Sequence, residues 1–200
     1  MSKTVFFLLC CLLIAGCTTK NTVLILNPTN LSNITPVQYN DFAVSSTGLA
    51  SGAFAPTLTV YNNTALYCYA GTVRNEYSYA STELFHDWKE GTVLYPHIHT
   101  FTGVNTQSNY TFKLDYTLYD SNHSVNGVTF VNISNNGNML LSNFVNNINA
   151  SSFKIGSVLG FTITRLQDNA YDTYTGCVGV SQVSVHYEID SLGSSSLFTK

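Results

Sequence analysis

His97 and His99 are the residues whose type and spacing point most directly to chemistry. Residues two apart on a β-strand project from the same face, and two imidazoles on one face can chelate a transition-metal ion. Two ligands per chain are too few for a closed site. If an ion is bound, we therefore expect a homotrimer in which the histidine pairs of three chains meet at the symmetry axis. The alternative, which we favour, is that both histidines are hydrogen-bonded, half-buried side chains at a subunit contact.

The segment around these histidines does not form a complete catalytic site. His86 and Asp87 are adjacent and can in principle support acid–base chemistry. However, no G-x-S-x-G elbow occurs, and neither Cys68 nor Cys177 lies in a recognisable nucleophile context. A metal-dependent enzyme built on the histidine pair would need a third protein ligand and an open coordination position. We therefore predict that the protein is not an enzyme, with no catalytic residues and no cofactor beyond that metal ion.

The elements that carry these residues are predicted to be strands. Residues 110–119 alternate most clearly, with Phe112, Leu114 and Leu118 on one face, which is typical of a half-buried strand. Further strands are expected at residues 57–61, 65–70, 76–85, 93–102, 128–133, 157–165 and 178–190, with one short helix at 140–148. About eight strands at short, regular spacing predict an all-β fold, an antiparallel jelly-roll-like β-sandwich.

The N-terminal part of the chain is predicted to lie outside this sandwich. Residues 1–17 resemble a leader, because a short apolar run ends in Leu13-Ile14-Ala15-Gly16-Cys17, a lipobox-like sequence in which Cys17 would be lipidated. The alternative is an apolar arm that stays on the protein and docks against a partner. The remaining divisions are an extended arm over 18–55 with a short strand near 22–26, the β-sandwich over 56–194, and a polar tail over 195–200.

Composition limits the partners. Only 10% of the residues are charged, the net charge is -3 and no run of Lys or Arg occurs, so the electrostatic footprint of a nucleic-acid-binding protein is missing. Asn, Ser, Thr and Tyr must cover the surface, which suits contacts with neighbouring subunits or sugars. A membrane contact is expected only if Cys17 is lipidated. Cys68 and Cys177 are either one disulfide of an exported protein or small buried apolar residues.

Two blocks of sequence resemble uncharacterised virion structural proteins of tailed bacteriophages. Their P-H-D-Y-K-E-G-T-D-L-x-P-H-x-H motif is matched by Phe85-His86-Asp87-Trp88-Lys89-Glu90-Gly91-Thr92-Val93-Leu94-Tyr95-Pro96-His97-Ile98-His99. Their R-x-x-D…D-T-Y-x-G…H-Y-x-I-D-S-x-G-S motif is matched by Arg165, Asp168, Asp172-Thr173-Tyr174-Thr175-Gly176 and His186-Tyr187-Glu188-Ile189-Asp190-Ser191-Leu192-Gly193-Ser194. The resemblance covers residues 83–194 and implies a β-rich component of the head, neck or tail of a virion, or a decoration protein.

Physical reasoning gives these motif residues structural roles. The turn at 88–91 is expected to fix the entry to the histidine-bearing strand, and Arg165 is expected to pair with Asp172. His186 is expected on the outward face of the last strand, with its distance from His97 left open. Two features depart from the phage pattern: Thr100 stands where those proteins have Trp, and a leader ending in Cys17 is not typical of them.

Two functions remain in competition. The first is a homotrimeric virion protein that contacts other virion proteins and acts in particle assembly or host attachment. The second is an exported lipoprotein or secreted carbohydrate-binding β-sandwich of the bacterial envelope or the extracellular space, whose Tyr and Asn side chains bind a glycan. We predict the first.

Overall fold

The structure is a computed structural model that describes residues 38–45, 50–51, 54–71 and 75–190, all within the unit Val37–Lys200. The predicted leader with Cys17, the short strand near 22–26 and the polar tail over 195–200 lie outside the described residues. Among the residues described, every regular element is a strand, and none forms a helix able to cross a membrane.

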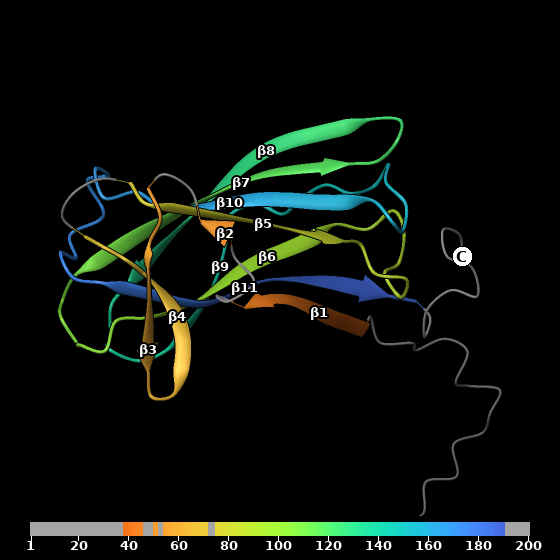
Figure 1. The fold of residues 1–200 in the computed structure, drawn as a ribbon. Helices are drawn as coiled ribbons and strands as arrows, with labels where there is room; N and C mark the ends of the chain where they lie inside the picture. Colours follow the sequence, from red (N-terminus) through yellow and green to blue (C-terminus); the bar gives the residue numbers. More distant parts are fainter. Residues whose placement is uncertain (1–37, 46–49, 52–53, 72–74, 191–200) are drawn as a thin grey trace, which may run out of the picture. The chain divides into compact units, whose positions relative to one another are not determined.

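The first sheet is built around the long strand β11. Its hydrogen-bonded order is β3-β4-β11-β6-β9, and β1 pairs with β11 outside this path (Figure 1). Because β6 occupies one edge of β11, β4 and β1 share the other edge, β1 pairing with Gln182–Ile189. The strands are β1 (Gln38–Ser45), β3 (Thr57–Tyr61), β4 (Thr64–Tyr69), β6 (Leu94–Phe101), β9 (Leu140–Asn143) and β11 (Val178–Ile189).

The second sheet has the order β2-β5-β10-β7-β8. Its strands are β2 (Ala50–Ser51), β5 (Tyr77–Glu83), β7 (Asn109–Tyr119), β8 (Ser124–Ser134) and β10 (Val158–Arg165). All strand pairs in both sheets are antiparallel. The predicted all-β, antiparallel jelly-roll-like sandwich is therefore confirmed.

The core lies between the sheets and is formed by every second side chain of the central strands. The alternating residues Leu159, Phe161 and Ile163 of β10 are buried in it, and burying one such side chain contributes about 1.5–3 kcal/mol. On β11, Val183 and Val185 are buried in the same core. Because side chains alternate along a strand, Ser184 and His186, which follow these two valines, project from the outer face of the first sheet.

The predicted helix at 140–148 is wrong. Residues 140–143 form β9 beside β6, and the chain then continues along the same edge, where Phe144 N–H donates to the Pro96 carbonyl (3.0 Å) and Ile148 N–H to the Leu94 carbonyl (2.9 Å). Phe144 and Ile148 are both buried and lie four residues apart, a spacing that resembles one face of a helix. In the structure, the backbone N–H groups of these two residues instead bond to carbonyls at the edge of β6. The asparagine-rich sequence adds little helix propensity.

The predicted extended arm over 18–55 is also corrected. Within it, β1 pairs with β11 over eight residues and β2 adds a short edge to β5. Phe42 of β1 is buried in the core, so the sandwich begins before residue 56. Together with β9, these strands bring the described total to eleven, where about eight were expected from their spacing.

Candidate functional site

Three strands of the first sheet bring a carboxylate and two histidines together on its outer face. Asp41 of β1 lies opposite His186 of β11, and Ser184, two residues earlier on β11, lies opposite His97 of β6. The three side chains therefore occupy adjacent rows of one face, across strands that are distant in sequence. The strand order left open by the sequence thus places His186 next to His97.

The distances within this cluster are short. Asp41 Oδ2 lies 3.6 Å from His97 Nε2 and 3.8 Å from His186 Nε2, and the ring centroids of the two histidines are 4.2 Å apart. One potential ligand atom of each residue lies within 4.8 Å of the others. The His99 ring is 5.2 Å from that of His97, so the predicted pair is adjacent, but His99 is not part of the three-residue cluster.

His97 is fully buried although it faces away from the core. Neither of its ring nitrogens makes a well-formed hydrogen bond among the described residues, and His99 Nε2 is in the same condition. Burial lowers the pKa of His97, and the positive forms of His186 and His99 lower it further, whereas Asp41 raises it. The His97 imidazole is therefore neutral at pH 7 and has a lone pair available. Among the described residues, His97 therefore lacks the hydrogen bond that was expected from the sequence.

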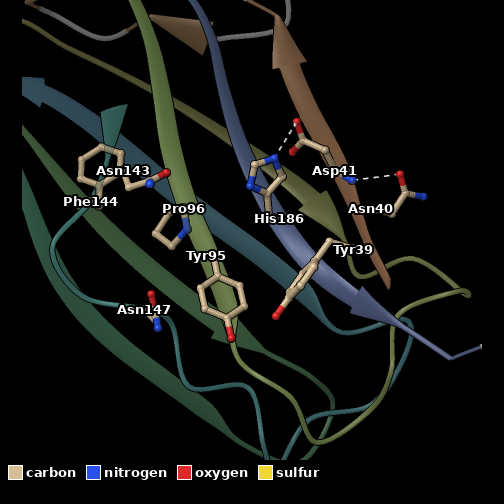
Figure 2. Close-up of a pocket in the computed structure, with 9 residues that line it drawn as sticks. All are labelled: Tyr39, Asn40, Asp41, Tyr95, Pro96, Asn143, Phe144, Asn147 and His186. Atoms are coloured by element: carbon tan, nitrogen blue, oxygen red, sulfur yellow. Dashed lines mark hydrogen bonds and ion pairs between the residues drawn. The ribbon is translucent and has the colours of Figure 1, made fainter. Parts of the chain in front are cut away.

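A pocket of about 650 Å³ opens beside this cluster (Figure 2). Figure 2 shows Tyr39 of β1 and Tyr95 of β6 side by side, with their ring centroids 5.9 Å apart at 79°. Asp41 and His186 belong both to the pocket and to the cluster. The lining is Tyr39, Asn40, Asp41, Tyr95, Pro96, Asn143, Phe144, Asn147 and His186. The pocket thus combines two phenol rings with amide, carboxylate and imidazole groups.

The motif residues 86–91 lie at one side of this sheet and make structural contacts. Asp87 accepts hydrogen bonds from Tyr187 Oη and Asn40 Nδ2, both at 2.9 Å. Trp88 is buried and donates its indole N–H to Thr92 Oγ1 at 3.0 Å.

The neighbouring charged residues fasten the same turn. Lys89 pairs with Glu188 at 3.0 Å and Glu90 with Lys154 at 2.9 Å, while Gly91 supplies a left-handed backbone conformation with φ of 84°. His86 is half-buried in this turn. The distinctive sequence of this segment therefore holds β1 and β11 in place rather than lining the pocket.

Other predicted residues lie away from the pocket. Arg165 and Asp172 form a fully buried ion pair, with Arg165 Nη2 2.8 Å from Asp172 Oδ1. Asp190 is exposed at the end of β11. Cys68 and Cys177 form a disulfide with a Cα–Cα distance of 5.4 Å, which resolves the alternatives left open by the sequence.

The sequence pattern did not identify Asp41, Tyr39 or the asparagines of the 140–148 segment as site residues. The only indication of β1 was the alternation of Phe42 and Val44, which is too short to outweigh the polar composition around it. Because one chain supplies three potential ligands, a metal site here does not require a trimer axis.

Comparison with known proteins supports the fold. No family model and no curated protein matches the chain. The mosquito-larvicidal Cry4Aa toxin from Bacillus thuringiensis is similar in structure with a TM-score of 0.52 and 8% identity, over 76% of this chain and 24% of the toxin. Because the identity is low, this likeness shows the fold alone.

Two carbohydrate-related structures from Clostridium thermocellum give weaker alignments. The CBM22-1–GH10 modules of xylanase 10B align with a TM-score of 0.42 and 16% identity, over 80% of this chain and 30% of that one. A family 11 carbohydrate-binding module aligns with a TM-score of 0.37 and 9% identity, over 78% and 91%. This chain spans less than a third of the toxin and of the xylanase fragment.

Proposed function

We propose that this protein is a glycan-binding β-sandwich module whose binding site is the pocket between β1, β6, β11 and the segment after β9. The observation that carries the proposal is the pair Tyr39 and Tyr95 at the mouth of an open pocket lined by amides and a carboxylate. Ligand sites of this kind combine apolar and aromatic surface with a few polar groups that fix orientation.

The two tyrosines supply the surface on which a sugar ring can rest. Tyr39 is 54% exposed, so its ring is available to solvent. A sugar ring has one face of C–H groups, which packs well against an aromatic ring whose π face is negative. Burial and the neighbouring Tyr39 raise the pKa of Tyr95, so its hydroxyl stays protonated and can donate to a sugar oxygen.

The polar lining matches the hydroxyl groups of a sugar. Asn143 and Asn147 are exposed at the pocket, and each amide offers two donors and one acceptor oxygen. Asp41 adds acceptors only. A neutral ligand suits this set better than an anionic one, because no Lys or Arg is among the described residues that line the pocket.

The proposed location is outside the cytoplasm. The Cys68–Cys177 disulfide supports this, since disulfides persist in secreted and periplasmic compartments and are rare in the cytosol. A virion role and virion partners remain predictions that rest on the sequence resemblance, and the homotrimer remains a prediction that rests on the pair His97 and His99. An attachment protein that reads a host glycan would satisfy both interpretations.

The test is a glycan array printed with bacterial, plant and animal polysaccharides, followed by calorimetry on the glycan that binds best. Tyr39→Ala and Tyr95→Ala are each expected to weaken binding about 5- to 30-fold, which corresponds to roughly 1–2 kcal/mol. Tyr171→Ala is the matched control, since Tyr171 is 63% exposed and does not line the pocket. Absence of any bound glycan, or an equal loss in the control, would refute the proposal.

A further inference from the structure

We propose that Asp41, His97 and His186 form a binding site for one divalent transition-metal ion per chain, with Zn²⁺ as the ion that fits best. This proposal does not rest on the proposed glycan function, because the ion would be held by three protein side chains, although Asp41 and His186 also line the pocket. Two imidazole nitrogens and one carboxylate oxygen are ligands that Zn²⁺ takes readily in proteins, and imidazole also suits Cu²⁺ and Ni²⁺.

The spacing of the ligand atoms fits such an ion. Zn²⁺ binds nitrogen and oxygen ligands at about 2.0–2.2 Å in tetrahedral geometry, which places neighbouring ligand atoms about 3.3–3.5 Å apart. Asp41 Oδ2 lies 3.6 Å and 3.8 Å from the two histidine Nε2 atoms, and the third separation does not exceed 4.8 Å. Small side-chain rotations at Asp41 and His186, both partly exposed, would close the remaining gap.

The condition of His97 is an independent indication of a ligand. Its side chain is fully buried, and Nε2 points into the cluster without a well-formed hydrogen bond. Buried polar groups are almost always hydrogen-bonded or bound to a metal, so a bare imidazole here is costly. A metal ion at Nε2 would supply the missing interaction.

The charge and position of the other ligands agree with this arrangement. Asp41 supplies a negative charge that offsets part of the charge of a divalent ion. Because Asp41 and His186 line the pocket, the exposed side of the cluster faces it, and the fourth coordination position would be open there to water or to a ligand oxygen.

The proposal differs from a site made by the His97 and His99 pair. The cross-strand site requires His186 and Asp41, whereas the same-strand pair requires His99. His186→Ala and His99→Ala therefore give opposite results under the two arrangements. His123→Ala is the matched control, because His123 also lies beside an aspartate, Asp120, at 3.1 Å, but belongs to the hairpin between β7 and β8 in the second sheet.

The experiment is calorimetric titration of the EDTA-stripped full chain with ZnCl₂, repeated with Co²⁺ while recording its visible absorption. We expect one ion to bind per chain, and we expect the Co²⁺ absorption spectrum to be typical of an ion with a low coordination number. His186→Ala and Asp41→Ala should weaken Zn²⁺ binding by about 100-fold or more, since even a change outside the ligand shell costs about 10- to 100-fold. His99→Ala and His123→Ala should each weaken Zn²⁺ binding much less than His186→Ala does, because neither side chain belongs to the ligand set.

Folding is controlled by circular dichroism of each variant. His97→Ala changes a buried position, so its Zn²⁺ binding is interpreted only if its spectrum matches that of the wild type. Asp41 and His186 are partly exposed, so the variants at these two positions test the proposal even if His97→Ala does not fold. The proposal is overturned if the folded wild type binds Zn²⁺ no better than His186→Ala, if His99→Ala removes binding while His186→Ala does not, or if one ion is bound per three chains.

Discussion

Replacement of Asp172 by Ala is expected to destabilise the protein by about 3–5 kcal/mol. Arg165 is fully buried and its partner carboxylate is 2% exposed, so solvent does not screen the pair. All five guanidinium N–H groups are used. Nε and one Nη2 hydrogen donate to Asp172 at 2.9 and 2.8 Å, and the other three donate to the carbonyls of Tyr69, Tyr174 and Gly176.

The magnitude follows from what the substitution leaves behind. Asp172→Ala removes two charge-assisted hydrogen bonds, each contributing about 1.5–3 kcal/mol, and leaves a buried positive charge with carbonyl partners only. Against a total domain stability of about 5–15 kcal/mol, this loss is large. Urea unfolding at pH 7, followed by circular dichroism, measures it as a lower midpoint at unchanged slope.

The control is the same substitution at an exposed ion pair of similar length. Lys113 Nζ and Asp115 Oδ2 are 2.7 Å apart with side chains 29% and 45% exposed, so Asp115→Ala is expected to cost less than about 1 kcal/mol. If Asp172→Ala costs no more than this control, the argument from burial is refuted. The double variant Arg165→Met/Asp172→Ala should also stay destabilised, because three carbonyls lose their donor.

Three further predictions concern stability. Cys68→Ser/Cys177→Ser should lower the free energy of unfolding by about 2–5 kcal/mol, since the disulfide closes a long loop of the unfolded chain; urea unfolding with and without reductant tests this. The metal-free protein should lose stability as pH falls from 7.5 to 5.5, because burial holds the folded-state pKa of His97 below 6.5 and the unfolded chain binds more protons there; His97→Phe should flatten this dependence of the urea midpoint. Gly71→Ala should cost about 1–3 kcal/mol, measured as a lower melting temperature, because its Cβ would lie 2.5 Å from the Tyr174 carbonyl oxygen.

The central strands were predictable because their pattern is local. Every second residue of β7 from Phe112 to Leu118 is apolar, and a period of two over that length is specific for a strand. The ion pair of Arg165 and Asp172 was also expected, since residues seven apart across one loop can meet easily. These features require little knowledge of which strands are neighbours.

The site was not predictable to the same extent, because it depends on long-range strand order. Asp41 meets His186 only because β1 pairs with a strand more than 140 positions later in the chain, and nothing in either segment specifies that partner. The 140–148 segment shows the same limitation. The spacing of its apolar residues fits either a helix or an extended segment at a sheet edge. The segment is extended because its backbone N–H groups bond to the free carbonyls of β6.

β1 is the element on which both proposed sites depend. It supplies Tyr39 to the pocket and Asp41 to the metal cluster, and Figure 1 shows it lying along β11. Asp87 joins the two strands, because its carboxylate accepts from Asn40 of β1 and from Tyr187 of β11. The turn that is most distinctive in the sequence therefore carries no site residue of its own, and its function is to fix β1 in the register that assembles the site.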